Sequence, residues 1–247
     1  MRRALIGILT LTVLSCKEKA KEVITVQEIV NKSIEVSGGK QYANKGSSFE
    51  FRNRKYISQN VDGKKVFKRI LVMDSVTILD IKTNSAFQRF MNDTLVHLPD
   101  SISTRYANSV NSVHYFARLP YGLNDNAVNK ELLGEETVKG KEYYKVKVTF
   151  DQVGGGDDFD DTYVYWFNKE TYKPDYLAYD FHVNGGGQRF REAYNERYVD
   201  GIRFVDYNNY KPKTKGSDIM EIGQLFEKDE LDLLSKIELS KIHVTEN

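Results

Sequence analysis

Four carboxylates crowd into the stretch VGGGDDFDDTYVYW, where Asp157, Asp158, Asp160 and Asp161 follow three glycines. Such a group repels itself, so it needs a cation, a basic partner or surrounding water. Carboxylate oxygens are ligands for divalent cations, which makes the four aspartates weak candidates for a metal site. The stretch lacks the EF-hand order, with its glycine at the sixth position and its terminal glutamate. Solvated turn residues are therefore the favoured interpretation.

A second glycine triplet, Gly185 to Gly187 in VNGGGQRFREAYN, leads into Arg189 and Arg191. Strand alternation places these two arginines on one face. Their guanidinium groups would pair with the aspartates if the strands after the two triplets were neighbours. His182, just before the triplet, completes the candidate site. Turns between strands are the most economical interpretation of the two triplets. A plain hairpin turn seldom needs three glycines, however, so a second hypothesis is that the two loops form the rim or gate of a ligand-binding cleft.

Other signatures of catalysis are missing from the sequence. The four histidines are scattered, and the HExxH, GxSxG, Walker and GxGxxG patterns do not occur. We therefore predict no catalytic residue and no cofactor, with a divalent cation as the one weak alternative. Removing Arg2 and Arg3 with a leader leaves 34 of the 36 basic residues against 35 acidic ones, a net charge of −1. This balanced charge gives no indication of a basic surface that would bind nucleic acid.

The N-terminal stretch MRRALIGILTLTVLSC has two arginines, an apolar run too short to span a membrane, and a small residue before Cys16. It is similar to a bacterial lipoprotein signal, in which the cysteine carries acyl chains such as palmitate and becomes the mature N-terminus. Cys16 is the only cysteine, so the mature chain has no disulfide and no free thiol. We expect a signal peptide at 1–15, a tether at 16–25 and a single domain at 26–247. Lys17 favours the outer membrane, with the protein facing the periplasm or the cell surface.

Two amphipathic helices and many strands must position the candidate residues. Thr25 and Glu28 form a capping box at the start of the first helix, and Gly38 and Gly39 end it. A second helix is expected over 102–116. Alternating strands fill 48–98 and 142–210, while the C-terminus reads as a helix over 218–234 or a strand over 235–244. The pattern predicts an α+β, mainly antiparallel fold: a curved meander, or incomplete β-barrel, packed on an N-terminal helix and a mid-chain helix.

The helix ending in VSGGKQYANKGSSFEF and the later pieces GKEYYKV, FNKETY and VDGIRF resemble the LolA/LolB-like lipoprotein-carrier superfamily. They are most similar to a family of Bacteroidota lipoproteins without an established activity. The resemblance spans roughly residues 26 to 245 and implies a half-barrel with an apolar concavity that holds acyl chains in some members. The 16 tyrosines suit a ligand with apolar and polar parts.

Three functions follow, in order of preference. The first is a membrane-anchored, non-catalytic lipoprotein whose cleft binds an apolar or amphiphilic ligand, such as a lipid, an acyl group or a lipoprotein. The second is a cell-envelope module for a glycan or protein partner, and the third is a metal-assisted hydrolase. We expect a monomer that contacts the membrane through acylated Cys16.

Overall fold

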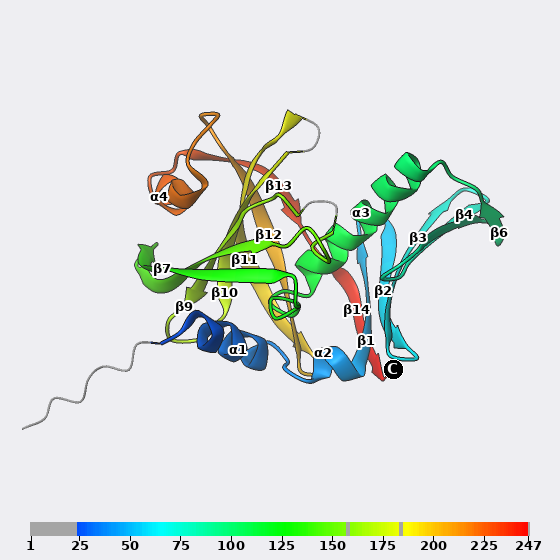
Figure 1. Ribbon diagram of the computed structural model, residues 1–247, viewed down its shortest axis with the longest axis horizontal. Helices are drawn as coiled ribbons and strands as arrows, with labels where there is room; N and C mark the ends of the chain where they lie inside the picture. The colour runs from blue at the N-terminus through cyan, green and yellow to red at the C-terminus, as the bar shows by residue number, and fades with distance from the viewer. Residues whose placement is uncertain (1–23, 157–158, 183–184, 247) are drawn as a thin grey trace, which may run out of the picture.

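The computed structural model describes residues 24–156, 159–182 and 185–246, whose fourteen strands form two antiparallel sheets of seven (Figure 1). Sheet A has the order β14 (Ser240–Glu246), β1 (Lys45–Phe51), β2 (Arg54–Val61), β3 (Lys64–Met73), β4 (Val76–Lys82), β5 (Phe87–Met91), β6 (Thr94–Val96). Sheet B has the order β13 (Leu231–Ile237), β12 (Ile202–Pro212), β11 (Gly187–Val199), β10 (Pro174–Phe181), β9 (Tyr163–Asn168), β8 (Lys141–Phe150), β7 (Val128–Val138). The helices are α1 (Val26–Val36), α2 (Gln41–Asn44), α3 (Asp100–Ala117) and α4 (Ile222–Glu227), the last preceded by the 3-10 turn η2 (Ile219–Glu221).

Helix α1 begins and ends where the sequence predicts. The Thr25 side chain accepts a hydrogen bond from the Glu28 amide, and the Glu28 carboxylate accepts one from the Thr25 amide, which completes the capping box. Ile29 and Val30 are fully buried against sheet B. Burying a side chain of this size stabilises the fold by about 1.5–3 kcal/mol, so this apolar stripe holds the helix in place.

Sheet B is covered on both faces. Helix α1 and the end of α3 pack on one face, against Tyr165, Phe167 and their neighbours. Helix α4 packs on the other, where Phe226 meets the Trp166 layer. This double cover explains why all six residues of β9 are buried, without the polar alternation of a one-sided strand.

Helix α3 connects the two sheets (Figure 1). Its middle lies on sheet A, where Ser109 accepts a hydrogen bond from Arg69. Beneath it, Asp80 accepts from both Arg69 and Arg89 and is almost fully buried. At its far end, the hydroxyls of Tyr115 and Tyr165 are hydrogen-bonded at 2.6 Å, which ties the helix to sheet B.

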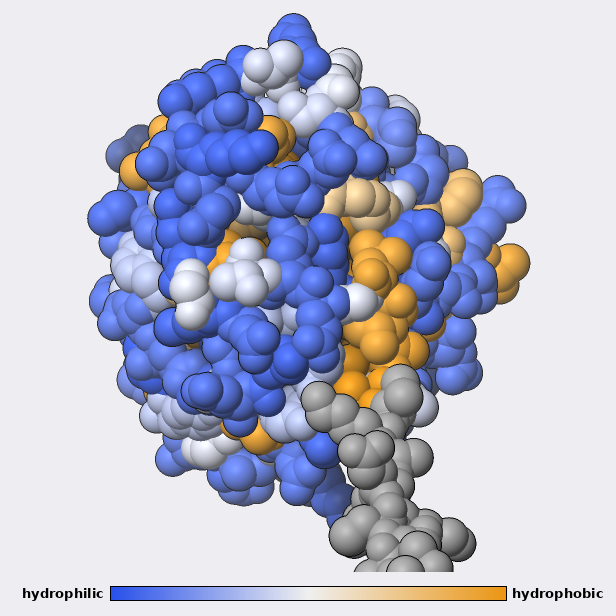
Figure 2. All heavy atoms as spheres, turned by 90° about the vertical axis from the view of Figure 1, so that its left-hand side faces the viewer, coloured by the Kyte–Doolittle hydropathy of each residue, from blue (hydrophilic) through white to orange (hydrophobic). Residues whose placement is uncertain are grey.

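The chain crosses from sheet B to sheet A between β13 and β14. Arg197 donates to the Leu239 carbonyl, and the Leu239 amide donates to Asp206, so the crossing residue is held on both sides. Strand β14 then pairs with β1, and the two sheets form an open arrangement. Figure 2 shows the side of the molecule formed by α1, β7 and α4, which is mostly hydrophilic apart from an apolar strip.

The α+β, mainly antiparallel class expected from the sequence is confirmed, as are the two principal helices. The strands form two sheets, where the sequence suggested one meander. Strand β7 was not predicted, and the C-terminal region contains a short helix followed by two strands. Among the described residues, no helix is long and apolar enough to cross a membrane.

Candidate functional site

A cleft of about 1670 Å³ opens between sheet A and the segments that follow α3 and β8. The β2–β3 hairpin lines one side, and residues 121–122, 124–128 and the first glycine triplet, Gly154 to Gly156, line the other. A smaller hollow of about 380 Å³ lies beside it and shares Tyr115, Phe150, Gly155 and Gly156 with it. The first glycine loop is therefore part of the cleft wall.

The wall of the cleft combines aromatic and polar side chains. Four rings line it, from Phe67, Tyr115, Tyr121 and Phe150. Seven carboxamides join them, from Asn44, Asn60, Asn84, Asn111, Asn124, Asn126 and Gln152. The lining is thus more polar than the apolar concavity that the sequence suggested.

The cleft wall contains a positively charged side chain, Arg118, that is held in one position. Arg118 is only 8% exposed, donates hydrogen bonds to Ser58 Oγ at 2.9 Å and to the Tyr42 carbonyl at 3.2 Å, and lies over the Tyr121 ring. Burial lowers the pKa of Arg118, although a guanidinium stays charged at any physiological pH. The positive charge is therefore permanent and held in one place.

The neighbouring His114 is fully buried and stacks on Phe67 with ring centroids 4.4 Å apart. Burial lowers the pKa of His114 to about 3, which makes the ring neutral at physiological pH. It is therefore part of the packing under the cleft and carries no charge there.

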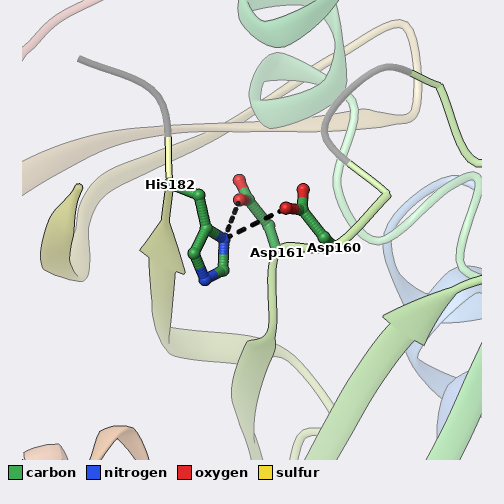
Figure 3. Close-up of side chains that lie close together, drawn as sticks. All are labelled: Asp160, Asp161 and His182. Atoms are coloured by element: carbon green, nitrogen blue, oxygen red, sulfur yellow. Dashed lines mark ion pairs between the residues drawn. The ribbon is translucent and has the colours of Figure 1, made fainter. Parts of the chain in front are cut away.

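Near the first glycine loop, Asp160, Asp161 and His182 come together at one end of sheet B (Figure 3). The pairing of β9 with β10 brings them there: the Thr162 amide donates to Asp180 Oδ1 at 2.8 Å, and the Asp180 amide donates to the Thr162 carbonyl. His182 then stands opposite the two aspartates. Its Nδ1 lies 3.4 Å from Asp161 Oδ1 and 3.5 Å from Asp160 Oδ2.

This Asp160–Asp161–His182 cluster has the composition of a divalent-metal site. Its three ligand atoms lie within 4.8 Å of one another, and Asp161 is buried while the other two residues are exposed. Two ligands bound to one tetrahedral ion at about 2.0–2.2 Å lie roughly 3.3–3.6 Å apart, close to the two distances seen here. The arrangement would leave a fourth position for water. Asp157 and Asp158, the other two predicted aspartates, lie outside the described residues, as does Cys16.

The two arginines do not reach this cluster through neighbouring strands, because β10 lies between β9 and β11. Arg189 lies over the Phe181 ring and donates to the Gln188 carbonyl. Arg191 is 8% exposed, and its guanidinium carbon lies 3.6 Å from the centre of the Phe116 ring. Its Nη2 donates to the Tyr179 hydroxyl, while Nε and Nη1 are buried with no acceptor among the described residues. Among the described residues, His182 is thus an ion-pair partner of Asp160 and Asp161. The predicted rim residues that the structure describes, Asp160, Asp161, His182, Arg189 and Arg191, are not part of the lining of either hollow.

Sequence reasoning gave no role to Arg118 or to the asparagine-rich run LNDNAVN, Leu123 to Asn129, much of which lines the cleft. The composition of that run was the one available signal.

Residues 5–239 match the model of a family of unknown function, DUF6503. The chain belongs to this family.

No curated protein sequence matches this DUF6503 chain. Among solved structures, a DUF1329 family protein from Desulfovibrio piger is similar over 88% of this chain and 92% of its own, with a TM-score of 0.50 and 13% identity. A LolA superfamily protein, NE2245 from Nitrosomonas europaea, aligns over 89% and 93% of the two chains at a TM-score of 0.47 and 12% identity. A putative outer membrane lipoprotein-sorting protein domain from Vibrio parahaemolyticus aligns over 87% and 93% at 0.43 and 11%. At these identities the similarity concerns the fold alone.

Proposed function

We propose that this DUF6503 protein is a cell-envelope lipoprotein that binds an amphiphilic ligand, a lipid or acyl compound, in the cleft between its sheets. The observation that carries the proposal is the cleft itself, with its volume of about 1670 Å³ and its wall of aromatic and polar groups. Binding pockets for small ligands combine apolar surface with a few placed polar groups. The proposal assigns binding and no chemistry to the site.

The wall offers both kinds of contact that an amphiphile needs. The rings of Phe67 and Phe150 supply apolar surface, and tyrosine rings pack while their hydroxyls stay hydrated. Arg118 supplies a charge that needs no movement to meet a polar headgroup. A ligand with one polar end and one apolar part therefore uses the whole wall.

The membrane attachment belongs to the same proposal and rests on the sequence. Acylated Cys16 would hold a monomer at the outer membrane, with residues 16–25 as the tether and 26–247 as one domain. Cys16→Ala should remove the acylated N-terminal peptide from the mass spectrum of the protein and release the protein into the soluble fraction when membranes are washed at high salt. Retention of a chain without an acylated peptide after the high-salt wash would contradict this attachment.

Ligand binding is tested by filling the cleft. Asn111 lies on α3 and lines both hollows, so Asn111→Trp should occupy ligand space. Arg105→Trp is the matched control, because Arg105 is exposed on the same helix and does not line either hollow. Native purification, extraction and mass spectrometry should find the ligand in the wild type and in the control.

A fluorescent fatty acid should bind Asn111→Trp roughly tenfold or more weakly, equivalent to about 1.4 kcal/mol. Thermal unfolding of both variants checks that the fold is kept. Equal binding by the wild type and Asn111→Trp, or a wild type that repeatedly purifies without an extractable ligand and does not bind the probe, would overturn the proposal.

The carboxamide content of the wall favours a second candidate, a glycan-binding module. Asparagine and glutamine side chains both donate and accept hydrogen bonds, which matches sugar hydroxyls, and seven of them line the cleft. Binding on a glycan array that Asn111→Trp abolishes, together with the absence of lipid in extracts, would favour this candidate over the first.

A further inference from the structure

The outer face of sheet A, opposite α3, carries a surface of its own. Side chains alternate along each strand, and Arg69 and Asp80 mark the face that α3 covers. Their sequence neighbours, such as Ile70 and Leu79, therefore project from the opposite face. The register of β2 to β6 brings these outward residues into rows, one of which runs Lys55, Ile70, Leu79, Phe90 and Leu95.

We call the outer face of strands β2 to β6 the apolar–lysine face. Its apolar members are Ile57, Val61, Val66, Ile70, Val72, Leu79, Ile81, Phe90 and Leu95. Val72 is 64% exposed, Val61 49% and Leu95 41%, and none of the nine belongs to a buried core cluster of the described residues. Helix α3, which contacts β3, β4 and β5, lies on the other side (Figure 1). Contiguous apolar surface of this kind marks an interaction site.

The charges of this face have one sign. Lys55, Lys64 and Lys68 project from it, and the only acidic residue of strands β2 to β6 is Asp80, which points to the covered face. Asp62, Asp74 and Asp93 are in the turns at the strand ends. The charged side chains that the strands contribute to this face are thus all cationic.

We propose that the apolar–lysine face docks on a lipid bilayer that contains anionic lipids. Apolar side chains enter the headgroup boundary, while lysine stems run along them and place the ammonium groups at the lipid phosphates. A second copy of the chain fits less well, because a face-to-face dimer would bring lysines against lysines without carboxylates between them. This contact is separate from the cleft and from Cys16, so it stands or fails independently of the proposed function.

The test uses the full chain with Cys16→Ser, which removes the acylation site. Flotation with vesicles of phosphatidylglycerol and phosphatidylcholine should show binding that weakens with added salt, and vesicles of phosphatidylcholine alone should bind poorly. Lys55→Glu with Lys68→Glu should weaken binding roughly tenfold or more, because each lysine near an anionic surface contributes about a factor of five. Lys211→Glu with Lys215→Glu changes the charge equally at exposed positions outside this face and should bind like the parent.

The apolar part of the contact has its own variant. Val72→Gln with Leu95→Gln leaves the charge unchanged and alters two exposed side chains, so the fold should persist, as circular dichroism will show. This pair should also weaken vesicle binding. Equal binding by the parent and either face variant would overturn the proposal. So would a lipid-free dimer, seen by analytical ultracentrifugation and dispersed by Val72→Gln with Leu95→Gln, because it would assign the face to a second copy.

Discussion

Replacing Arg191 by methionine should stabilise the protein. Its buried Nε and Nη1 have no acceptor among the described residues, and a buried unsatisfied donor costs about 1–3 kcal/mol. Against this, the change removes the hydrogen bond to Tyr179, worth about 0.5–1.5 kcal/mol, and a stacking contact with Phe116, worth about 2 kcal/mol when desolvated. Methionine regains part of the loss through sulfur–aromatic contacts. The balance is a gain of about 1–3 kcal/mol in the free energy of unfolding.

Urea unfolding of the wild type and Arg191→Met measures this gain directly. In a chain of this size the midpoint of thermal unfolding should rise by about 2–4 °C for each kcal/mol. Arg189→Met is the control: Arg189 lies on the same strand, is partly exposed and donates to a carbonyl, so its replacement should stay within about 0.5 kcal/mol.

The same variant separates stability from ligand binding. Arg191 does not line either hollow, so Arg191→Met should bind the fluorescent fatty acid like the wild type. A loss of more than about 1 kcal/mol on replacing Arg191 would refute the reasoning, because it would mean that the guanidinium is well satisfied in the free protein.

If the Asp160–Asp161–His182 cluster binds a divalent metal, calorimetric titration with Zn²⁺ should show one site in the wild type that His182→Ala weakens strongly. Identical titrations of the wild type and His182→Ala would exclude the cluster as the site. An esterase and phosphatase screen with the ion bound tests the hydrolase alternative. Asp80→Ala should lower the free energy of unfolding by about 3–5 kcal/mol, since it leaves the buried Arg69 and the half-buried Arg89 without their carboxylate. An effect below about 1 kcal/mol in urea would show that water replaces the carboxylate. His114 is neutral in the folded state and titrates near its ordinary value of 6.5 when unfolded, so its contribution is complete above pH 6.5 and is lost as the pH falls towards about 3. Stability curves over that range should be flatter for His114→Phe, and an unchanged slope would contradict the assignment.

Local signals in the sequence were sufficient for the helices and for most strands. The Thr25–Glu28 capping box and the Gly38–Gly39 pair gave the bounds of α1 because capping depends on neighbouring residues alone. Strand β7 was not predicted from its sequence, VNKELLGEETV, for two reasons. Gly134 interrupts the strand pattern where the register with β8 shifts, and the many charged residues are typical of a loop. The burial of every residue of β9 depends on cover from α1 and α4, which no local pattern reveals.

The site was predictable only in part. The sequence indicated both glycine loops, and the first lines the cleft. The partner of the aspartates was assigned to Arg189 and Arg191 on the assumption that β9 and β11 are neighbours, whereas β10 lies between them and brings His182 to Asp160 and Asp161 instead. The polar wall of the cleft could not be foreseen, because Arg118, Asn60 and Gln152 are distant in the chain and meet only through tertiary packing.

The pairing of β1 with β14 determines the order in which the molecule can be assembled. Lys45 lies opposite Glu246, so β1 pairs with a strand that is among the last described residues. The outer edge of β1 stays uncovered until β14 has formed. Contacts so distant in sequence slow folding, and until they form β1 offers unpaired backbone to any other chain. Sheet B, by contrast, connects neighbouring strands from β7 to β13 in chain order and can form without β14. Crowding and aggregation during biogenesis should therefore concentrate on sheet A, and a chaperone that shields β1 would protect the chain at its most exposed stage.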